Sequence, residues 1–210
     1  MARLGVLLAA NWGLGERLLA ALLDCPEVRL LGVVTRAQSG GGDPWADAVR
    51  RRAEAAGLTV WDEAALPPLE LGALARRLGA DVLWLHANMR RLPREAFTAP
   101  RLGTVNVHAS LLPAYRGPSP QQWVLRNRER LTGLTSHFVD EGLDTGPIIH
   151  QVPVPVSPEE SLESLLEKSK EAAAPLVRGT VKRLLDPGFK PAPQDESRAS
   201  HAPRPKEDVT

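Results

Sequence analysis

Cysteine and long apolar runs are both scarce in this sequence. Cys25 is the only cysteine and lies in an apolar stretch, so no disulfide can form within the chain, which favours a reducing compartment. Charged or turn residues interrupt every apolar run well before the roughly 20 residues that a membrane-spanning helix needs. We therefore expect a cytoplasmic protein without a membrane-spanning helix.

An excess of charge of one sign is missing too. The 26 Lys and Arg residues stand against 25 Asp and Glu residues, which leaves a formal net charge of +1. No arginine-rich run or basic stripe stands out, so charge does not indicate a nucleic-acid partner. His, Cys and acidic residues do not occur at ligand-like spacing either, and we expect no bound metal.

The apolar segments that are present alternate with stretches of helical spacing. Strands are predicted over residues 4–10, 28–34, 58–61, 81–85 and 103–107, and the apolar runs of the first two indicate buried strands. Helices are predicted over residues 14–22, 45–56, 69–78 and 120–127. Such alternation is typical of an α/β fold with a mostly parallel, doubly wound sheet. Two further strands, over residues 132–139 and 148–156, are joined by a turn and predict an antiparallel extension of this sheet.

The last part of the chain changes character. Ser157 and Glu160 have the spacing of a capping box, with a proline at the first helical position, and predict a C-terminal helix that runs to Leu185. Beyond it, proline and charged residues dominate, so this segment cannot fold alone and is expected to pack little on the rest of the chain. We therefore predict one domain over residues 1–186 and a tail or linker remnant over residues 187–210.

Asn106 and His108 form a polar pair at the end of a predicted strand. Residues two apart in a strand point to the same side of the sheet, and in an open α/β sheet the carboxyl ends of strands border the ligand crevice. Asp144 lies in a turn rich in Gly and acidic residues, from which its carboxylate can reach the pair. Amide, imidazolium and carboxylate groups together suit acyl transfer through an oxyanion. On the residues alone, a structural polar pair and a turn acid remain the alternative.

The chemistry of these three residues leads to further expectations. If Asp144 keeps the imidazole charged, the pKa of His108 lies above its ordinary value. No activated Ser or Cys accompanies them, since Cys25 is remote and apolar in context, so direct transfer between two bound substrates is favoured over a covalent intermediate. His137 is expected to line the pocket or to fill a core position.

Two long blocks of the sequence resemble the signatures of the folate-dependent formyltransferase family. The first is residues 105–117, Val-Asn-Val-His-Ala-Ser-Leu-Leu-Pro-Ala-Tyr-Arg-Gly. The second comprises residues 132–137, Thr-Gly-Leu-Thr-Ser-His, and residues 140–151, Asp-Glu-Gly-Leu-Asp-Thr-Gly-Pro-Ile-Ile-His-Gln, at the expected separation from the first. The resemblance extends over roughly residues 80–185 and implies a Rossmann-like formyltransferase fold.

The resemblance also implies a chemistry and a co-substrate. It assigns catalytic roles to the matching Asn106, His108 and Asp144, within a catalytic domain over residues 1–186. The co-substrate is then 10-formyltetrahydrofolate, without a metal. The folate site is expected at residues that match two pocket loops of the family, namely Asn88, Met89, Arg90, Arg91, Leu92, Val139, Asp140, Glu141 and Gly142.

Residues that contact the amine acceptor are expected at two places. The start of the first helix exposes N–H groups that can bind an anion, and a loop follows the strand that carries His108. The residues expected at these places are Trp12, Gly13, Ser110, Tyr115, Arg116 and Gly117. For Arg116, holding a phosphate or carboxylate of the acceptor and bracing the loop are both open.

The acceptor stays open among the amines that the family uses, which are methionyl-tRNA, a nucleotide-linked amino sugar and glycinamide ribonucleotide. Bulky Trp12 and acidic Glu16 argue against the last, whose enzymes carry a Gly/Ser/Asn-rich phosphate loop at this place. Residues 115–123 look closer to the tRNA and sugar branches. The tRNA enzymes continue into a C-terminal barrel, and residues 193–208 resemble the linker that leads to it. The chain is then a truncated member or a lone catalytic domain.

Other activities compete with formyl transfer to an amine. A formyltetrahydrofolate hydrolase would let water reach the formyl carbon, and a binding module would keep the pocket without turnover. A nicotinamide-dependent oxidoreductase is the alternative from a different class, because Gly13 and Gly15 begin a dinucleotide fingerprint. Leu18 replaces its third glycine, and Thr35 and Arg36 stand where an acidic ribose ligand is needed. The oligomeric state is open, with a dimer as one option.

Overall fold

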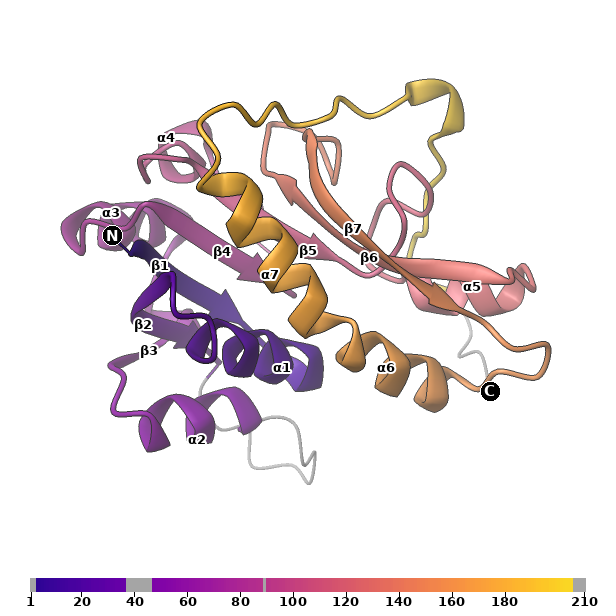
Figure 1. Ribbon diagram of the computed structural model, residues 1–210, viewed down its shortest axis with the longest axis horizontal. Helices are drawn as coiled ribbons and strands as arrows, with labels where there is room; N and C mark the ends of the chain where they lie inside the picture. Colours follow the sequence, from indigo (N-terminus) through magenta and orange to yellow (C-terminus); the bar gives the residue numbers. More distant parts are fainter. Residues whose placement is uncertain (1–2, 37–46, 89, 206–210) are drawn as a thin grey trace.

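The computed structural model describes residues 3–36, 47–88 and 90–205, and within these residues seven strands form one sheet (Figure 1). The order across the sheet is β3-β2-β1-β4-β5-β6-β7. The bounds are β1 Leu4–Ala10, β2 Val28–Thr35, β3 Val60–Asp62, β4 Val82–His86, β5 Thr104–His108, β6 Leu131–Phe138 and β7 Ile148–Pro155. Neighbours from β3 to β5 pair in parallel, whereas β6 pairs antiparallel with both β5 and β7. The predicted mostly parallel sheet with an antiparallel extension is confirmed.

Helices cover both faces of this sheet, as a doubly wound fold requires. Their bounds are α1 Trp12–Leu23, α2 Ala48–Ala55, α3 Pro68–Arg77, α4 Arg94–Phe97, α5 Pro120–Arg126, α6 Leu162–Glu171 and α7 Ala173–Leu184, with short 3-10 helices at Glu63–Ala65 and Glu196–Arg198. Residues 45 and 46, where the second helix was predicted to begin, lie outside the described residues.

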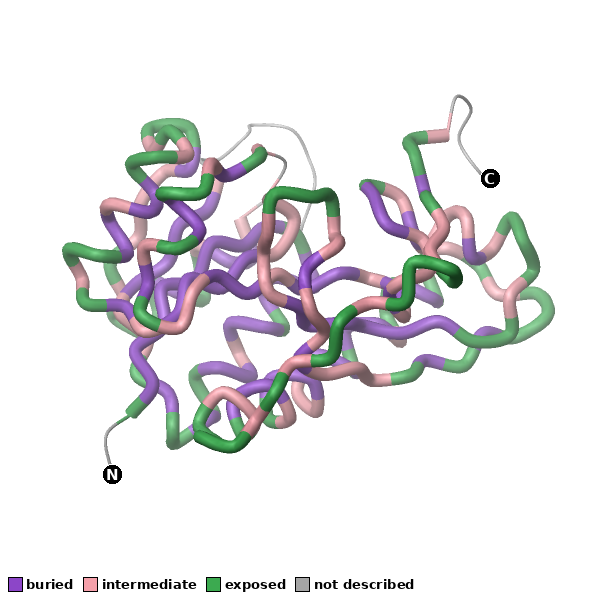
Figure 2. Tube along the Cα trace, turned by 90° about the horizontal axis from the view of Figure 1, so that it is seen from above, coloured by how far each residue is buried: buried purple, intermediate pink, exposed green. Residues whose placement is uncertain are grey.

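The side chains of β1 divide the interior into two cores. Val6 and Leu8 pack in a cluster with residues of α1, α2, α6 and α7, whereas Leu7 and Ala9 pack with residues of α3 and α4. Because both faces of β1 are covered, the strand is buried over its whole length, which explains its continuous apolar run. Figure 2 shows these buried segments running through the middle of the molecule.

The predicted C-terminal helix begins later than expected and is divided into two. Ser161, rather than Ser157, caps α6, and its hydroxyl accepts from the N–H of Ser164 at 3.1 Å. Glu160 does accept from the N–H of Ser157 at 3.0 Å, so half of the predicted box is present in a turn that precedes the helix. Pro175 lacks an N–H and its ring crowds the carbonyl four residues earlier, which explains the break between α6 and α7. The single helix from residue 157 was wrong.

Residues 187–205 run along the outside of the β6–β7 part of the sheet, in yellow in Figure 1. Isolated bridges join Ala192 to Ile148 and His201 to Arg116. Ala202 is fully buried. The segment therefore lies on the surface as predicted, but the expectation that it packs little on the rest of the chain was wrong, because polar contacts hold it and Phe189 and Ala202 pack against the rest of the chain.

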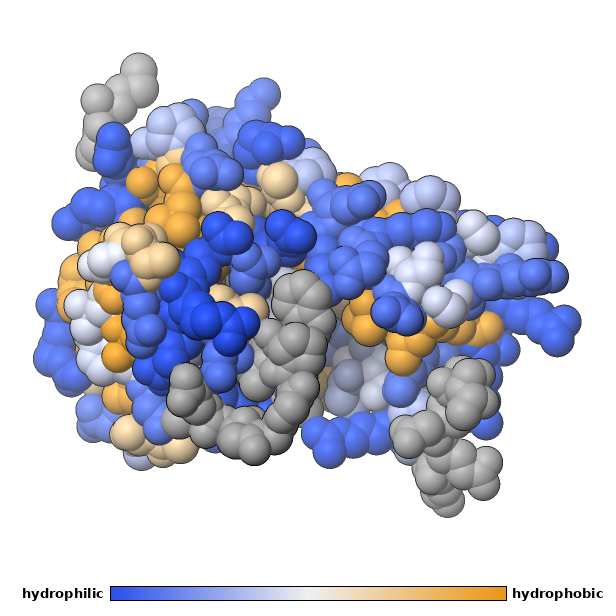
Figure 3. Space-filling view, turned by 90° about the horizontal axis from the view of Figure 1, so that it is seen from below, coloured by the Kyte–Doolittle hydropathy of each residue, from blue (hydrophilic) through white to orange (hydrophobic). Residues whose placement is uncertain are grey.

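The surface is mostly hydrophilic on the face shown in Figure 3, where apolar side chains form small patches. Among the described residues, the exposed large apolar side chains are spread over helices, a strand and loops, and they are Trp12, Leu23, Leu69, Leu131, Leu143, Leu166 and Leu185. Within the described residues, none of the helices is long and apolar enough to cross a membrane.

Candidate active site

The carboxyl end of β5 and the turn between β6 and β7 meet at one point. Asn106 and His108 lie on β5, and the antiparallel β6–β7 pair brings the turn that carries Asp144 back to them. Asp144 Oδ1 accepts from Asn106 Nδ2 at 3.4 Å, and Asp144 Oδ2 lies 3.4 Å from His108 Nδ1. The structure thus brings together the three residues for which the sequence predicted a common role.

Asp144 is held as an anion by the groups around it. The N–H of Gly117 donates to Asp144 Oδ2 at 2.9 Å, and His137 Nε2 lies 3.6 Å from Oδ1. Burial by itself raises the pKa of Asp144, but His108, His137 and the Gly117 N–H more than offset this and lower the pKa to about 2. The carboxylate is therefore ionised throughout the neutral range.

His108 is enclosed to an extent that the sequence could not reveal. Burial lowers the pKa of His108, and this outweighs the Asp144 carboxylate and the carbonyl of Tyr115, which both raise it. The expectation of a pKa above the ordinary value was therefore wrong, and the resting ring is neutral at neutral pH. Its Nε2 lies 2.8 Å from the carbonyl oxygen of Tyr115, an acceptor, so the single proton belongs on Nε2 and leaves Nδ1 facing Asp144.

His137 is the site residue whose position the sequence left most open. In the register of β5 and β6 it lies directly opposite Asn106, and it lines the same cavity. Its Nδ1 lies 2.8 Å from the carbonyl oxygen of Phe138, and its Nε2 lies 3.1 Å from Asn106 Nδ2 and 3.6 Å from Asp144 Oδ1. The pocket-lining role expected for His137 agrees with this geometry. Strand register, rather than any local motif, is the signal that places it beside Asn106.

A cavity of about 350 Å³ opens beside these groups. Its lining combines apolar walls with amide, acidic and basic groups, from Leu85, Asn88, Arg90, Arg91, Leu92, Asn106, His137, Val139, Asp140, Gly142, Leu143 and Asp144. Most residues predicted for the folate site are among them. Glu141 is not, although its backbone carbonyl accepts from Arg91, and Met89 lies outside the described residues. A lining that mixes apolar side chains with amide, acidic and basic groups fits a flat, partly polar heterocycle such as a pterin.

Two residues predicted to contact the acceptor instead bind other parts of the chain. Ser110 is fully buried and donates to the carbonyl of Ala114 at 2.6 Å. Arg116 is only 3% exposed, and its guanidinium binds Glu196 at 2.7 Å and the side-chain oxygen of Gln194. Of the two roles left open for Arg116, the structure favours bracing the loop.

The backbone groups of Tyr115 and Gly117 contact His108 and Asp144. The Tyr115 carbonyl faces His108, and the Gly117 N–H faces Asp144. Both residues have positive φ, 62° for Tyr115 and 117° for Gly117, so this loop turns its peptide groups inward in a conformation that side chains usually oppose. The predicted loop therefore belongs to the site, with its peptide groups rather than its side chains in contact.

Trp12 and Gly13 lie at the start of α1 and do not line this cavity. Trp12 is 43% exposed, and the guanidinium of Arg36 stacks over its ring at 5.3 Å. Gly13 is buried in the first turn of the helix. These two residues remain predictions for the acceptor side.

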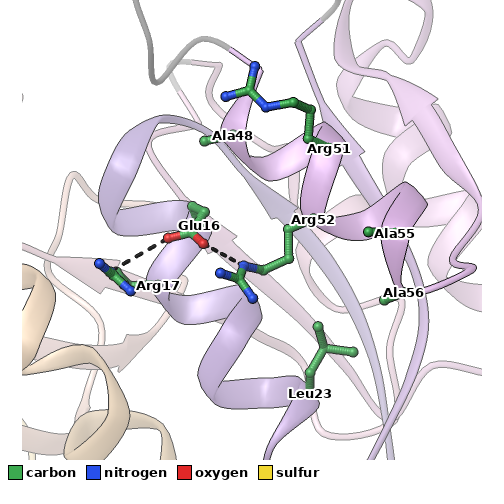
Figure 4. Close-up of a pocket in the computed structure, with 8 residues that line it drawn as sticks. All are labelled: Glu16, Arg17, Leu23, Ala48, Arg51, Arg52, Ala55 and Ala56. Atoms are coloured by element: carbon green, nitrogen blue, oxygen red, sulfur yellow. Dashed lines mark hydrogen bonds and ion pairs between the residues drawn. The ribbon is translucent and has the colours of Figure 1, made fainter.

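A second depression, of about 650 Å³, lies between α1 and α2 (Figure 4). Glu16 is paired there with Arg17 and Arg52, and the other lining side chains are Leu23, Ala48, Arg51, Ala55 and Ala56. This lining contains no His, Cys or amide group, so the smaller cavity beside Asp144 is the better place for proton transfer and carbonyl chemistry.

Within residues 3–36, 47–88 and 90–205, no group of three or more His, Cys, Asp or Glu side chains is arranged to hold a metal ion.

Known proteins share sequence similarity with this chain. The formyl transferase family model matches residues 22–179. Methionyl-tRNA formyltransferase from Synechococcus sp. (strain JA-3-3Ab) is 42% identical over 153 residues, which are 72% of this chain and 47% of that protein. The chain thus spans about half the length of the curated relatives it matches.

Solved structures share the fold. Glycinamide ribonucleotide transformylase 1 from Symbiobacterium toebii has a TM-score of 0.75 at 27% identity, over 92% of this chain and 95% of that one. A formyltetrahydrofolate deformylase from Pseudomonas syringae pv. tomato has a TM-score of 0.72 at 25% identity, over 93% of this chain and 67% of that one. The Rossmann-like formyltransferase fold is thereby confirmed.

Proposed function

We propose, since the chain belongs to the formyl transferase family, that it moves a formyl group from 10-formyltetrahydrofolate to a primary amine. The observation that carries the proposal is that Asn106 and the anionic Asp144 line the 350 Å³ cavity, with His108 Nδ1 3.4 Å behind the Asp144 carboxylate. An amide donor, a neutral imidazole and a carboxylate are the groups that direct acyl transfer requires.

The cavity offers a place for the pterin. Leu92 and Val139 supply apolar walls, and the backbone around Asn88 and Asp140 supplies donors and acceptors for ring heteroatoms. The bound folate would supply the formyl carbon. Its position beside Asn106 would let the Nδ2 group exchange its 3.4 Å hydrogen bond to Asp144 Oδ1 for one to the formyl oxygen.

The neutral resting state of His108 suggests how the proton moves. When the amine attacks, it loses a proton, and the carboxylate of Asp144 can relay that proton to the free Nδ1 of His108. The ring then becomes an imidazolium beside an anion, which offsets the cost of charging a buried group. The positive ring and the Asn106 amide together stabilise the oxyanion, and the proton leaves with the departing folate nitrogen.

We favour the amino group of methionyl-tRNA as acceptor, with a nucleotide-linked amino sugar next. The 42% identity to a protein named methionyl-tRNA formyltransferase supports the former. The likeness to a formyltetrahydrofolate deformylase keeps hydrolysis as a second candidate, in which water takes the place of the amine.

A single-turnover assay separates these activities. The protein is mixed with 10-formyltetrahydrofolate and, in parallel, with methionyl-tRNA, an amino sugar linked to dTDP, glycinamide ribonucleotide or no amine, and both formylated product and free formate are measured. Formyl transfer to one amine that is lost in Asp144→Asn and kept in Glu54→Gln, an exposed carboxylate on α2, is the expected result. Formate release at the same rate with and without amines would instead establish a hydrolase.

A further inference from the structure

Residues 192–203, here called the strap, connect the two loops that carry the catalytic groups. At one end Ala192 exchanges two backbone hydrogen bonds with Ile148, at 2.7 and 2.9 Å, just after the turn that holds Asp144. At the other end Arg116 donates to Ser200 at 2.8 Å and accepts from Ala202 at 2.7 Å. The strap is therefore hydrogen-bonded through its backbone to both loops.

The side chain of Gln194 lies between the two loops. Its Nε2 donates to the backbone carbonyls of Asp144 at 2.8 Å and Gly146 at 2.7 Å. Its Oε1 accepts from the buried Arg116 guanidinium, at 2.7 Å from Nη2. One amide thus fixes the peptide of the catalytic carboxylate relative to the loop that supplies the Gly117 N–H.

The strap contacts two residues whose backbone is in the left-handed region. Asp144 and Tyr115 both have positive φ, 55° and 62°, a region that non-glycine residues rarely adopt unless neighbouring contacts hold them there. Gln194 binds the carbonyl of Asp144, and the hydroxyl of Ser200 accepts from the N–H of Tyr115 at 2.9 Å. Each strained residue is therefore restrained by a side chain of the strap.

We propose that Gln194 and Ser200 are positioning residues for formyl transfer, an inference that rests on the proposed function of Asp144 and His108. Gln194 sets the position of the Asp144 carboxylate, and Ser200 sets the Tyr115 carbonyl that orients the His108 ring. A displacement of about 1 Å in such groups is enough to slow a reaction strongly while substrates still bind.

Gln194→Glu tests the first half of this proposal. The substitution keeps an acceptor for Arg116 and replaces the donor that faces Asp144 and Gly146 with an anionic oxygen. Gln121→Glu is the matched control, because the Gln121 side chain also donates a hydrogen bond, to Ser169 at 2.7 Å, but this bond joins α5 to α6 and not the two loops. We expect Gln194→Glu to lower the single-turnover rate by about tenfold or more, and to leave the Kd of a non-transferring folate analogue within about threefold.

A second readout does not depend on activity. The Gly117 N–H binds Asp144 Oδ2, so its hydrogen exchange reports whether the carboxylate is held. We expect exchange at Gly117 to be about tenfold faster in Gln194→Glu and unchanged in Gln121→Glu. Ser200→Ala removes only the acceptor of the Tyr115 N–H and should accelerate hydrogen exchange at Tyr115. This variant tests the positioning role of the strap if Gln194→Glu does not fold.

Failure of the positioning role and failure of the proposed function give different results. Unchanged Gly117 exchange in Gln194→Glu, or equal losses of rate and melting temperature in Gln121→Glu, would overturn the positioning role. If the wild-type protein formylates none of the amines, the proposed function fails, and the exchange rates still decide whether the strap holds Asp144.

Discussion

The charge of Asp144 can be tested through folding stability before any substrate is known. Asp144→Asn keeps the shape of the side chain and removes its charge. The pKa of the Asp144 carboxyl falls from 3.8 to about 2 in the folded protein. One pKa unit corresponds to about 1.4 kcal/mol, and the side chain is only 12% exposed, so the ionised carboxylate contributes about 2 kcal/mol to the free energy of unfolding.

This contribution has a defined pH window. Because the folded pKa lies below the unfolded value, the stabilisation is complete above about pH 4 and disappears as the pH falls towards 2. Urea unfolding at neutral pH should therefore show Asp144→Asn to be less stable than the wild type by at most about 2 kcal/mol, because a neutral His108 ring no longer adds its attraction to the carboxylate, and the difference should shrink near pH 3. Glu54→Gln should show little difference at either pH, since Glu54 is exposed.

The same substitution affects catalysis through His108. Burial already lowers the pKa of His108 below 6.5, and Asp144 opposes that effect. Removing the carboxylate should lower the pKa further, so the acid limb of the pH–rate profile should move to lower pH. Single-turnover transfer should slow about a hundredfold or more in Asp144→Asn and in His108→Ala, because each loses the charged donor to the oxyanion.

The double variant decides whether the two residues act as one unit. Once either is removed the other has little left to contribute, so the double variant should be only slightly slower than each single one. Multiplicative losses, or a full rate in Asp144→Asn, would refute the coupling. An acid limb that moved to higher pH would show that Asp144 does not raise the pKa of His108.

Other changes address the pocket, the strap and the loop. Asn106→Ala should bind a folate analogue with near-wild-type Kd and not turn over, and a collapse of binding by calorimetry in a folded variant would mean that the pocket is elsewhere. A chain ended after Asp186 should melt several degrees lower and transfer slowly, because it loses the strap, whereas an unchanged melting temperature would contradict this. Gly117→Ala should reduce both activity and melting temperature, since φ is +117° and the new Cβ would lie 2.9 Å from the carbonyl oxygen of Ala202; wild-type values for both would refute the close approach.

Local pattern was enough to predict the sheet. Strands such as β1 and β4 are covered on both faces, so their sequences are continuous apolar runs that stand out without any structure. The end of β5 was predictable for the same reason, since Asn106 and His108 interrupt such a run at a strand end. Their catalytic roles, and that of Asp144, stay predictions that the geometry supports.

Contacts between distant segments were not predictable in this way. His137 lies beside Asn106 because of the register of β5 and β6, which no local spacing encodes. The pKa of His108 depends on how completely the fold encloses the ring, and the sequence showed only its charged partner. The strap has few apolar residues, so composition indicated a loose tail, whereas partly buried hydrogen bonds from Gln194 and Arg116 hold it.

The position of the strap in the chain also sets the order in which a newly made protein becomes competent. Gln194 is 50 residues beyond Asp144, and Ser200 is 85 residues beyond Tyr115. At 5–20 residues per second, a ribosome needs roughly 3 to 11 s to proceed from Asp144 to Ser200. During that interval the sheet and the cavity can form on the emerging chain while the carboxylate is not yet fixed. We expect a nascent chain to bind folate before it can consume the formyl group.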